Sequence, residues 1–235
     1  SEIETNTIDG WYSLVLTKGR HYSIDFVNEN YLPVSNKYDL RELEEYREEH
    51  ANVLMFDKID LAGKIVDDEL LTAVKASVTI RTIDGKSVGT FANVDNFNFS
   101  LDYKKEYLLS FGAENYELLV DTLNTLNITT PVFENAFKIK PRKVNFKMDV
   151  VDLNNNSKVK AKLIFKNKNR NETIETSSDE FVSLRSGDRY SVESSAEGYF
   201  FGNTEIVVDE LVAGPDGVFR SKEPFAVAAI TLNSS

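Results

Sequence analysis

LDYKKEYLLSFGAENY, residues 101–116, is the middle one of three copies of a single pattern, a Leu, a Tyr six residues later and a second Tyr nine residues after that. The other two copies consist of Leu16, Tyr22 and Tyr31, and of Leu184, Tyr190 and Tyr199. The first tyrosines of successive copies are 85 and then 83 residues apart, which is the size of a small all-β domain. The chain is therefore predicted to contain tandem copies of one module.

Apolar residues alternate with polar ones around each first tyrosine. Two residues after it stand Ile24, Leu109 and Val192, and this period of two predicts strands with one buried face. Three residues before it stand Gly19, Lys104 and Gly187, at an expected tight turn between strands. Before the second tyrosine come Asn30, Asn115 and Gly198, residue types that tolerate a left-handed backbone.

A second shared segment lies upstream in the last two copies. Val66-Asp67, a polar turn and Val74-Lys75-Ala76 match Val151-Asp152, a polar turn and Val159-Lys160-Ala161, again 85 residues apart. Each predicts a strand, a turn and an alternating strand. The carboxylates of Asp67 and Asp68 are expected to be solvated in their turn.

Together these motifs resemble the carboxypeptidase regulatory-domain-like, prealbumin-like β-sandwich of Bacteroidota cell-envelope proteins, which is often linked to domains similar to outer membrane protein A. The resemblance covers residues 63–232 as two copies and residues 1–61 as a partial third. It departs from the family at Lys104, which replaces the turn glycine, and at an insertion of residues 34–51. It implies tandem prealbumin-like or Ig-like antiparallel β-sandwiches with a non-catalytic role.

Three domains follow, at residues 1–62 (a partial sandwich), 63–142 and 143–235. Residues 38–50 have Leu43, Tyr46 and His50 at helical spacing, which predicts a short amphipathic helix inserted in the first copy. The first copy lacks the first two strands of the pattern, so we expect a piece of a longer polypeptide. The alternative is a divergent first domain that is complete. We expect Leu40, Leu43, Tyr46, Val53, Leu54 and Phe56 to cover its apolar face.

Composition restricts the classes of function. The net charge of −11 disfavours nucleic acid as a partner, and no stretch approaches the roughly 20 apolar residues of a transmembrane helix. The chain has no Cys, which removes disulfides and Cys-type zinc sites. The basic residues from Lys160 to Arg170 are expected to form the solvent face of a strand, or alternatively a strip that binds an anionic partner.

No catalytic constellation is evident, so we predict that the chain is not an enzyme and uses no cofactor or metal. The histidines, His21 and His50, match no ligand spacing, and no nucleotide or nucleophile motif occurs. Calcium at Asp152-Leu153-Asn154-Asn155-Asn156 is disfavoured because the loop lacks the glycine and terminal Glu of an EF-hand. A Lys147–Asn233 isopeptide is disfavoured because alternation places the nearby acid, Glu193, outward.

The expected role is a scaffold or protein-interaction segment of a larger bacterial cell-envelope protein, in the periplasm or at the cell surface. Membrane association would come through other parts of the parent protein, and the expected partners are proteins. The alternative is a carbohydrate-binding or adhesin module, because sandwich modules bind sugars through exposed aromatic side chains. The interaction surface is predicted at Trp11, Tyr199, Phe200 and Phe201.

Overall fold

The computed structural model describes residues 12–45 and 48–230. Every element in this part of the chain is a β-strand apart from two three-residue 3-10 helices, η1 (Thr125–Asn127) and η2 (Val208–Glu210). The predicted all-β class is confirmed. The chain divides into two compact units, one of Ser1–Ala62, Asn98–Tyr107 and Leu123–Glu134, the other of Gly63–Phe97, Leu108–Thr122 and Asn135–Ser235. The three predicted domains stay a prediction.

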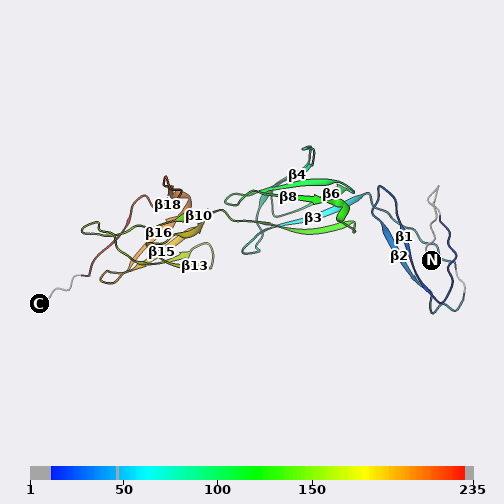
Figure 1. Cartoon of the computed structure of the whole chain (residues 1–235), viewed down its shortest axis with the longest axis horizontal. Coiled ribbons are helices and arrows are strands. Elements are labelled where there is room, and N and C mark those ends of the chain that lie inside the picture. The colour runs from blue at the N-terminus through cyan, green and yellow to red at the C-terminus, as the bar shows by residue number, and fades with distance from the viewer. Residues whose placement is uncertain (1–11, 46–47, 231–235) are drawn as a thin grey trace. The chain divides into compact units, whose positions relative to one another are not determined.

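The first unit contains an antiparallel hairpin of β1 (His21–Phe26) and β2 (Val34–Asp39), drawn in blue in Figure 1. Both strands alternate between exposed and half-buried residues, as the period of two predicts. Leu32, in the connection between them, is buried against Ile59 and Ile128. The connection of the hairpin therefore contributes Leu32 to the core of this unit.

The predicted helix over residues 38–50 is wrong for the part of it that the structure describes. Residues up to Asp39 belong to β2, and residues 40–45 and 48–50 form turns and irregular backbone. Asp39 accepts hydrogen bonds from the amide and guanidinium of Arg41 and holds a turn where a helix would begin. A helix of this length is marginal in water without packing partners, and strand pairing of Tyr38 with Tyr22 competes with it.

The expected cover for the first copy is also largely wrong. Leu54 and Phe56 are 74% and 42% exposed, while Leu40, Leu43 and Val53 are only half-buried. Tyr46 lies outside the described residues. The half-buried face of the hairpin is therefore not sealed by this segment.

The middle sheets have the orders β6-β3-β9 and β5-β4-β7-β8. Their strands are β3 (Lys58–Asp67), β4 (Ala76–Thr82), β5 (Ser87–Val94), β6 (Asn96–Asp102), β7 (Glu106–Gly112), β8 (Leu119–Asn124) and β9 (Val132–Ile139). In the second unit the rings of Phe97 and Phe137, from β6 and β9, pack on Phe111 from β7, with centroids 6.1 and 4.4 Å away. Aromatic side chains thus join the two sheets.

The C-terminal sheets have the orders β13-β12-β15-β16, β14-β10-β18-β17 and β11-β19. Their strands are β10 (Lys143–Phe146), β11 (Val150–Asp152), β12 (Lys162–Asn167), β13 (Thr173–Ser177), β14 (Val182–Arg185), β15 (Arg189–Ser195), β16 (Gly202–Val207), β17 (Val212–Ala213), β18 (Phe219–Arg220) and β19 (Phe225–Val227). Their core includes the buried Phe146, Phe165 and Tyr190. The expected antiparallel pairing is found for β12 with β13 and β15, but β10 pairs with β18, and β11 with β19, in parallel.

The sheets β5-β4-β7-β8 and β13-β12-β15-β16 share one strand order. Tyr107 lies on β7 and Tyr190 on β15, which occupy the same place in their sheets. This is the arrangement that the sequence repeat predicts.

The repeated first tyrosine makes the same hydrogen bond three times. The hydroxyls of Tyr22, Tyr107 and Tyr190 each accept a hydrogen bond from the backbone amide five residues earlier, at 3.0, 3.1 and 3.3 Å. The bond needs a tight turn between the two groups, and Gly19, Lys104 and Gly187 supply it with φ of 80°, 57° and 80°. Left-handed backbone also occurs at Asn115 and Gly198, but not at Asn30.

The hydroxyl of Tyr190 should contribute more stability than that of Tyr22. In Tyr190→Phe the buried amide of Arg185 loses its acceptor, which costs about 1–3 kcal/mol of unfolding free energy. Tyr22 and Thr17 bond at an exposed site, where water replaces the lost group. Urea unfolding combined with hydrogen exchange of the two strands measures both effects.

Tyr31→Phe is the control, since Tyr31 is 37% exposed. Equal losses for Tyr22→Phe and Tyr190→Phe would contradict the importance of burial.

Candidate functional site

The structure separates the residues of the predicted interaction surface. Trp11 lies outside the described residues. Tyr199 is half-buried against the C-terminal core, and its hydroxyl donates to Asp152 Oδ2 at 3.0 Å. Phe200 and Phe201 are 58% and 62% exposed. Among the three of these residues that the structure describes, the two phenylalanines are therefore accessible to a partner.

A buried polar cluster, which the sequence did not reveal, lies in the second unit around Asp67. Asp67 ends β3 and is fully buried, so the expectation of a solvated turn carboxylate is wrong for it. Its Oδ1 accepts hydrogen bonds from the amides of Glu69 and Leu70, both at 2.9 Å. The side chain therefore closes the turn that follows the strand.

Two further groups complete the contacts of Asp67. The hydroxyl of Tyr116 donates to Oδ2 at 2.9 Å. Arg185 donates through Nη1 to Oδ2 at 2.9 Å and through Nη2 to Oδ1 at 3.1 Å, the two-pronged geometry that favours Arg over Lys. The Arg185 side chain is only 3% exposed, so the two charges neutralise one another away from water.

Glu69 extends this cluster toward solvent. It accepts hydrogen bonds from Arg185 Nη2 at 2.5 Å and Nε at 3.2 Å, and it pairs with Lys143 at 2.5 Å. The Asp67 cluster, defined as Asp67, Glu69, Tyr116, Lys143 and Arg185, thus joins the end of β3 to the C-terminal strands β10 and β14.

The electrostatics of the cluster favour fixed charges. Burial alone would raise the pKa of Asp67, but hydrogen bonds from Arg185, Tyr116 and the turn amides outweigh burial and hold it far below its usual range. Burial alone would lower the pKa of Arg185, and its bonds to the two carboxylates raise it instead. Burial, together with Asp67, raises the pKa of Tyr116. None of these groups is poised to exchange a proton near neutral pH.

A small cavity of about 110 Å³ adjoins the cluster and is lined by residues that include Tyr116, Arg170, Arg185 and Asp188. Arg170 and Asn167 both donate to Asp188 Oδ2 at 2.8 Å, so this carboxylate also has its partners. Ligand pockets usually measure about 300–1,000 Å³. The geometry therefore suits a structural junction better than a substrate site.

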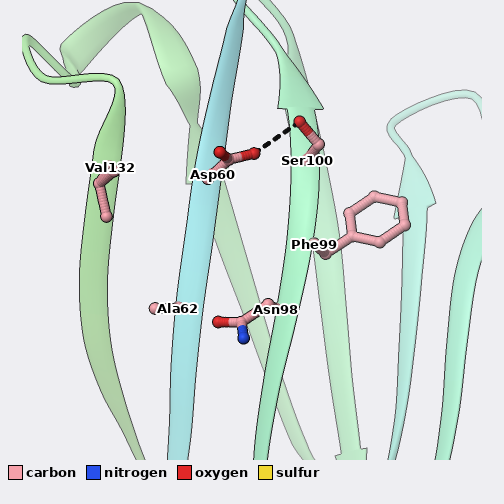
Figure 2. Close-up of a pocket in the computed structure, with 6 residues that line it drawn as sticks. All are labelled: Asp60, Ala62, Asn98, Phe99, Ser100 and Val132. Atoms are coloured by element: carbon pink, nitrogen blue, oxygen red, sulfur yellow. Dashed lines mark hydrogen bonds between the residues drawn. The ribbon is translucent and has the colours of Figure 1, made fainter.

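A larger hollow, of about 400 Å³, lies on the sheet β6-β3-β9 within the first unit. Figure 2 shows Asp60 and Ala62 on β3 beside Asn98 and Ser100 on β6. Ser100 Oγ donates to Asp60 Oδ1 at 2.7 Å. Neither of the two histidines lines the hollow, so the Ser and Asp have no base between them.

The basic residues of β12 and its flanks follow the solvent-face expectation. Lys160, Lys162 and Lys166 pair with Asp179, Glu175 and Glu193 at 2.9, 2.6 and 2.5 Å. Lys168 pairs with Glu205, and Arg170 with Asp188. Each cation of this strip therefore already has a carboxylate neighbour.

The turn of residues 152–157 uses side-chain oxygens for its own backbone amides. Asp152 Oδ1 accepts from the Asn154 amide at 2.7 Å, and Asn155 Oδ1 accepts from the Ser157 amide at 2.8 Å. Within the described ranges, no group of three or more acidic or histidine side chains is placed to hold a metal ion. No helix in these ranges is long and apolar enough to cross a membrane. Lys147 stands over the Phe181 ring, and Asn233 falls outside the described residues.

No family model and no curated protein matches the chain. Among solved structures it is similar to the Bacillus anthracis TIE protein, with 16% identity, a TM-score of 0.46, and 92% of this chain and 42% of that chain covered. For the C-terminal fragment of the pilus adhesin SpaC from Lactobacillus rhamnosus GG, the identity is 8% and the TM-score 0.41, with 75% of this chain and 100% of that chain covered. For the shaft pilin SpaA of that organism, the identity is 9% and the TM-score 0.30, with 74% of this chain and 99% of that chain covered. The chain spans less than half of the TIE protein chain, and no family is identified.

Asp67 and Arg185 should show strong energetic coupling. Asp67→Asn and Arg185→Met should each lower the free energy of unfolding by about 3–5 kcal/mol. Arg185→Met leaves the buried Asp67 without a cation, and Asp67→Asn leaves the buried Arg185 with Glu69 as its remaining carboxylate partner. The double variant should lose clearly less than the sum. Urea unfolding of all four proteins of the cycle measures the coupling.

The matched control is the exposed pair of Lys160 and Asp179, whose cycle should give a much smaller coupling.

The coupling between Asp67 and Arg185 should depend on pH, because the pKa of Asp67 is lower in the folded than in the unfolded state, where it is about 4. The coupling energy should be at its full value above about pH 5 and should decline as the pH falls below about 4. Equal coupling in the two cycles at pH 7 would contradict a buried ionic junction.

Proposed function

We propose that this chain is a non-catalytic scaffold segment of a larger bacterial cell-envelope protein, in which β-modules are joined in series and held by polar junctions. The Asp67 cluster carries this proposal. Its ion pair of Asp67 and Arg185 is the most deeply buried one among the described residues. This pair links β3 with β14 across 118 positions of the sequence.

A polar junction suits a scaffold because it specifies one arrangement. The bidentate bond between Arg185 and Asp67 requires a defined distance and plane, whereas an apolar contact tolerates sliding. Tyr116 and the turn amides hold the carboxylate through bonds that do not involve the arginine. The acceptor is therefore preorganised.

The cellular location in this proposal comes from the sequence motifs. The Val-Asp strand, the Val-Lys-Ala strand and the repeated tyrosines resemble carboxypeptidase regulatory-domain-like modules of envelope proteins. The proposal places the chain in the periplasm or at the cell surface, attached to the membrane through other parts of its parent protein. Its partners are then proteins of the same assembly.

Spin labels should reveal a fixed junction. Because the chain has no Cys, Thr90→Cys on β5 and Thr173→Cys on β13, both exposed, can carry one label each. We expect a single narrow distance distribution by electron–electron double resonance. Arg185→Met should broaden it, since the junction then loses its directional bonds.

Lys160→Met, which removes an exposed ion pair, is the control and should leave the distribution narrow. A distribution in the starting protein as broad as that of Arg185→Met would refute a scaffold held by this junction.

Carbohydrate binding is the second candidate, because Phe200 and Phe201 are adjacent and both more than half exposed. Two phenylalanines lack the polar handle that Tyr and Trp offer to a sugar hydroxyl. We therefore favour a protein contact for them.

Calorimetry with common polysaccharides should show no binding tighter than about millimolar, the weak end of the affinity scale. Hydrolase assays on the same polysaccharides should be blank. Submillimolar binding that is lost in Phe200→Ala and retained in Val212→Ala, a change at another exposed apolar residue, would favour the adhesin alternative.

A further inference from the structure

The C-terminal sheets contain a second copy of the acceptor that holds Arg185. Asp152 ends β11 as Asp67 ends β3. Its Oδ1 accepts from the turn amide of Asn154 at 2.7 Å, and its Oδ2 accepts from the hydroxyl of Tyr199 at 3.0 Å. The two carboxylates are therefore held by a turn and a tyrosine in the same way.

The two acceptors differ mainly in the cation, although Asp67 also accepts a second turn amide, that of Leu70. Asp67 binds both terminal nitrogens of Arg185. Asp152 is 5% exposed, and none of the ion pairs among the described residues includes it. A carboxylate this deeply buried is costly unless a positive charge or several donors compensate it. Asp152 thus has the geometry that binds an arginine at Asp67, but in the described part of the chain it has no cation as a partner.

Exposed apolar side chains lie in segments hydrogen-bonded to this end of the C-terminal sheets. Leu153, Phe200 and Ile230 are 62%, 58% and 45% exposed. Their amides donate to the carbonyls of Val227, Ala228 and Gly198 at 2.8–2.9 Å, so the backbone that carries them is fixed. Exposed apolar side chains that gather in one place mark sites of protein interaction.

We propose that Asp152 and Tyr199 form a docking site for a further β-module that presents an arginine, as β14 presents Arg185 to Asp67. The inference deepens the proposed function and rests on the modules being joined in series. The occupant is defined by charge and position: a guanidinium carried five residues before a corner tyrosine, where the chain itself places Arg185.

The other two repeats do not qualify as the occupant. The corresponding position holds Thr17 before Tyr22 and Asp102 before Tyr107. Neither side chain can donate to a carboxylate as a cation. The partner module must therefore resemble the C-terminal sheets of this chain rather than its first or middle sheets.

A tandem duplication tests the site with the whole chain retained. Residues 142–229 are inserted a second time after Ala229, because Ala229 bridges Tyr199 as Pro141 bridges Tyr116. The inserted Arg185 then follows Ala229 by 44 residues, the same spacing by which Arg185 follows Pro141. We expect the amide of the original Asn154 to exchange about tenfold more slowly than in the starting chain, since a charge-assisted bond stabilises its acceptor.

Segmental ¹⁵N labelling separates the two copies, and Asn154 of the inserted copy should keep the original rate because nothing docks on it. Arg185→Met in the inserted copy alone should abolish the added protection, and Lys160→Met there should preserve it. Exchange of the original Asn154 that is unchanged by the insertion, or protection that survives the inserted Arg185→Met, overturns the proposal. Neither result bears on the junction at Asp67, which the spin labels test separately.

Discussion

The carboxylate of Asp67 has to satisfy three demands at once. It closes its own turn, receives the hydroxyl of Tyr116 and neutralises Arg185. A buried carboxylate is tolerated only when its lone pairs are used, so the end of β3, the turn that contains Tyr116 and the end of β14 are constrained together. Asp67 and Arg185 are the last residues of β3 and β14, and Tyr116 follows a turn. Polar bonds thus hold the ends of these strands in place, whereas packed phenylalanines hold the two middle sheets together.

The tyrosine hydroxyls show how a repeated chemical device adapts to different surroundings. All three accept the amide five residues back, although Tyr190 is fully buried and the bond of Tyr22 is exposed. The device needs only a left-handed residue at the turn between the strands, and Lys104 takes that conformation where glycine stands in the other copies. The strain of one left-handed non-glycine residue, about 1–2 kcal/mol, is comparable with the cost of about 1–3 kcal/mol of leaving a buried amide unpaired.

Short-range patterns in the sequence were good predictors of strands and poor predictors of partners. Alternation around Tyr107 and Tyr190 located the strands, and the similar spacing of the copies anticipated the common strand order. The helix over residues 38–50 failed because helical spacing ignores the pairing of β2 with β1. Asp67 and Arg185 were missed because alternation cannot foresee a bond across 118 positions. The recurrence of an Asp and a Tyr, 49 positions apart at Asp67 and 47 at Asp152, was the one available signal.

The parallel pairing of β11 with β19 has a mechanical consequence. The first and last parts of the C-terminal sheets run side by side in the same direction, with Val150, Val151 and Asp152 opposite Phe225, Ala226 and Val227. A pull that separates the two ends of this region slides one strand along the other, so that the hydrogen bonds of the pair share the load and must break together. An antiparallel pair loaded from its open end would instead lose its bonds one after another. The mechanical resistance of the C-terminal sheets to pulling thus depends on the parallel direction of β11 and β19 rather than on the number of their contacts.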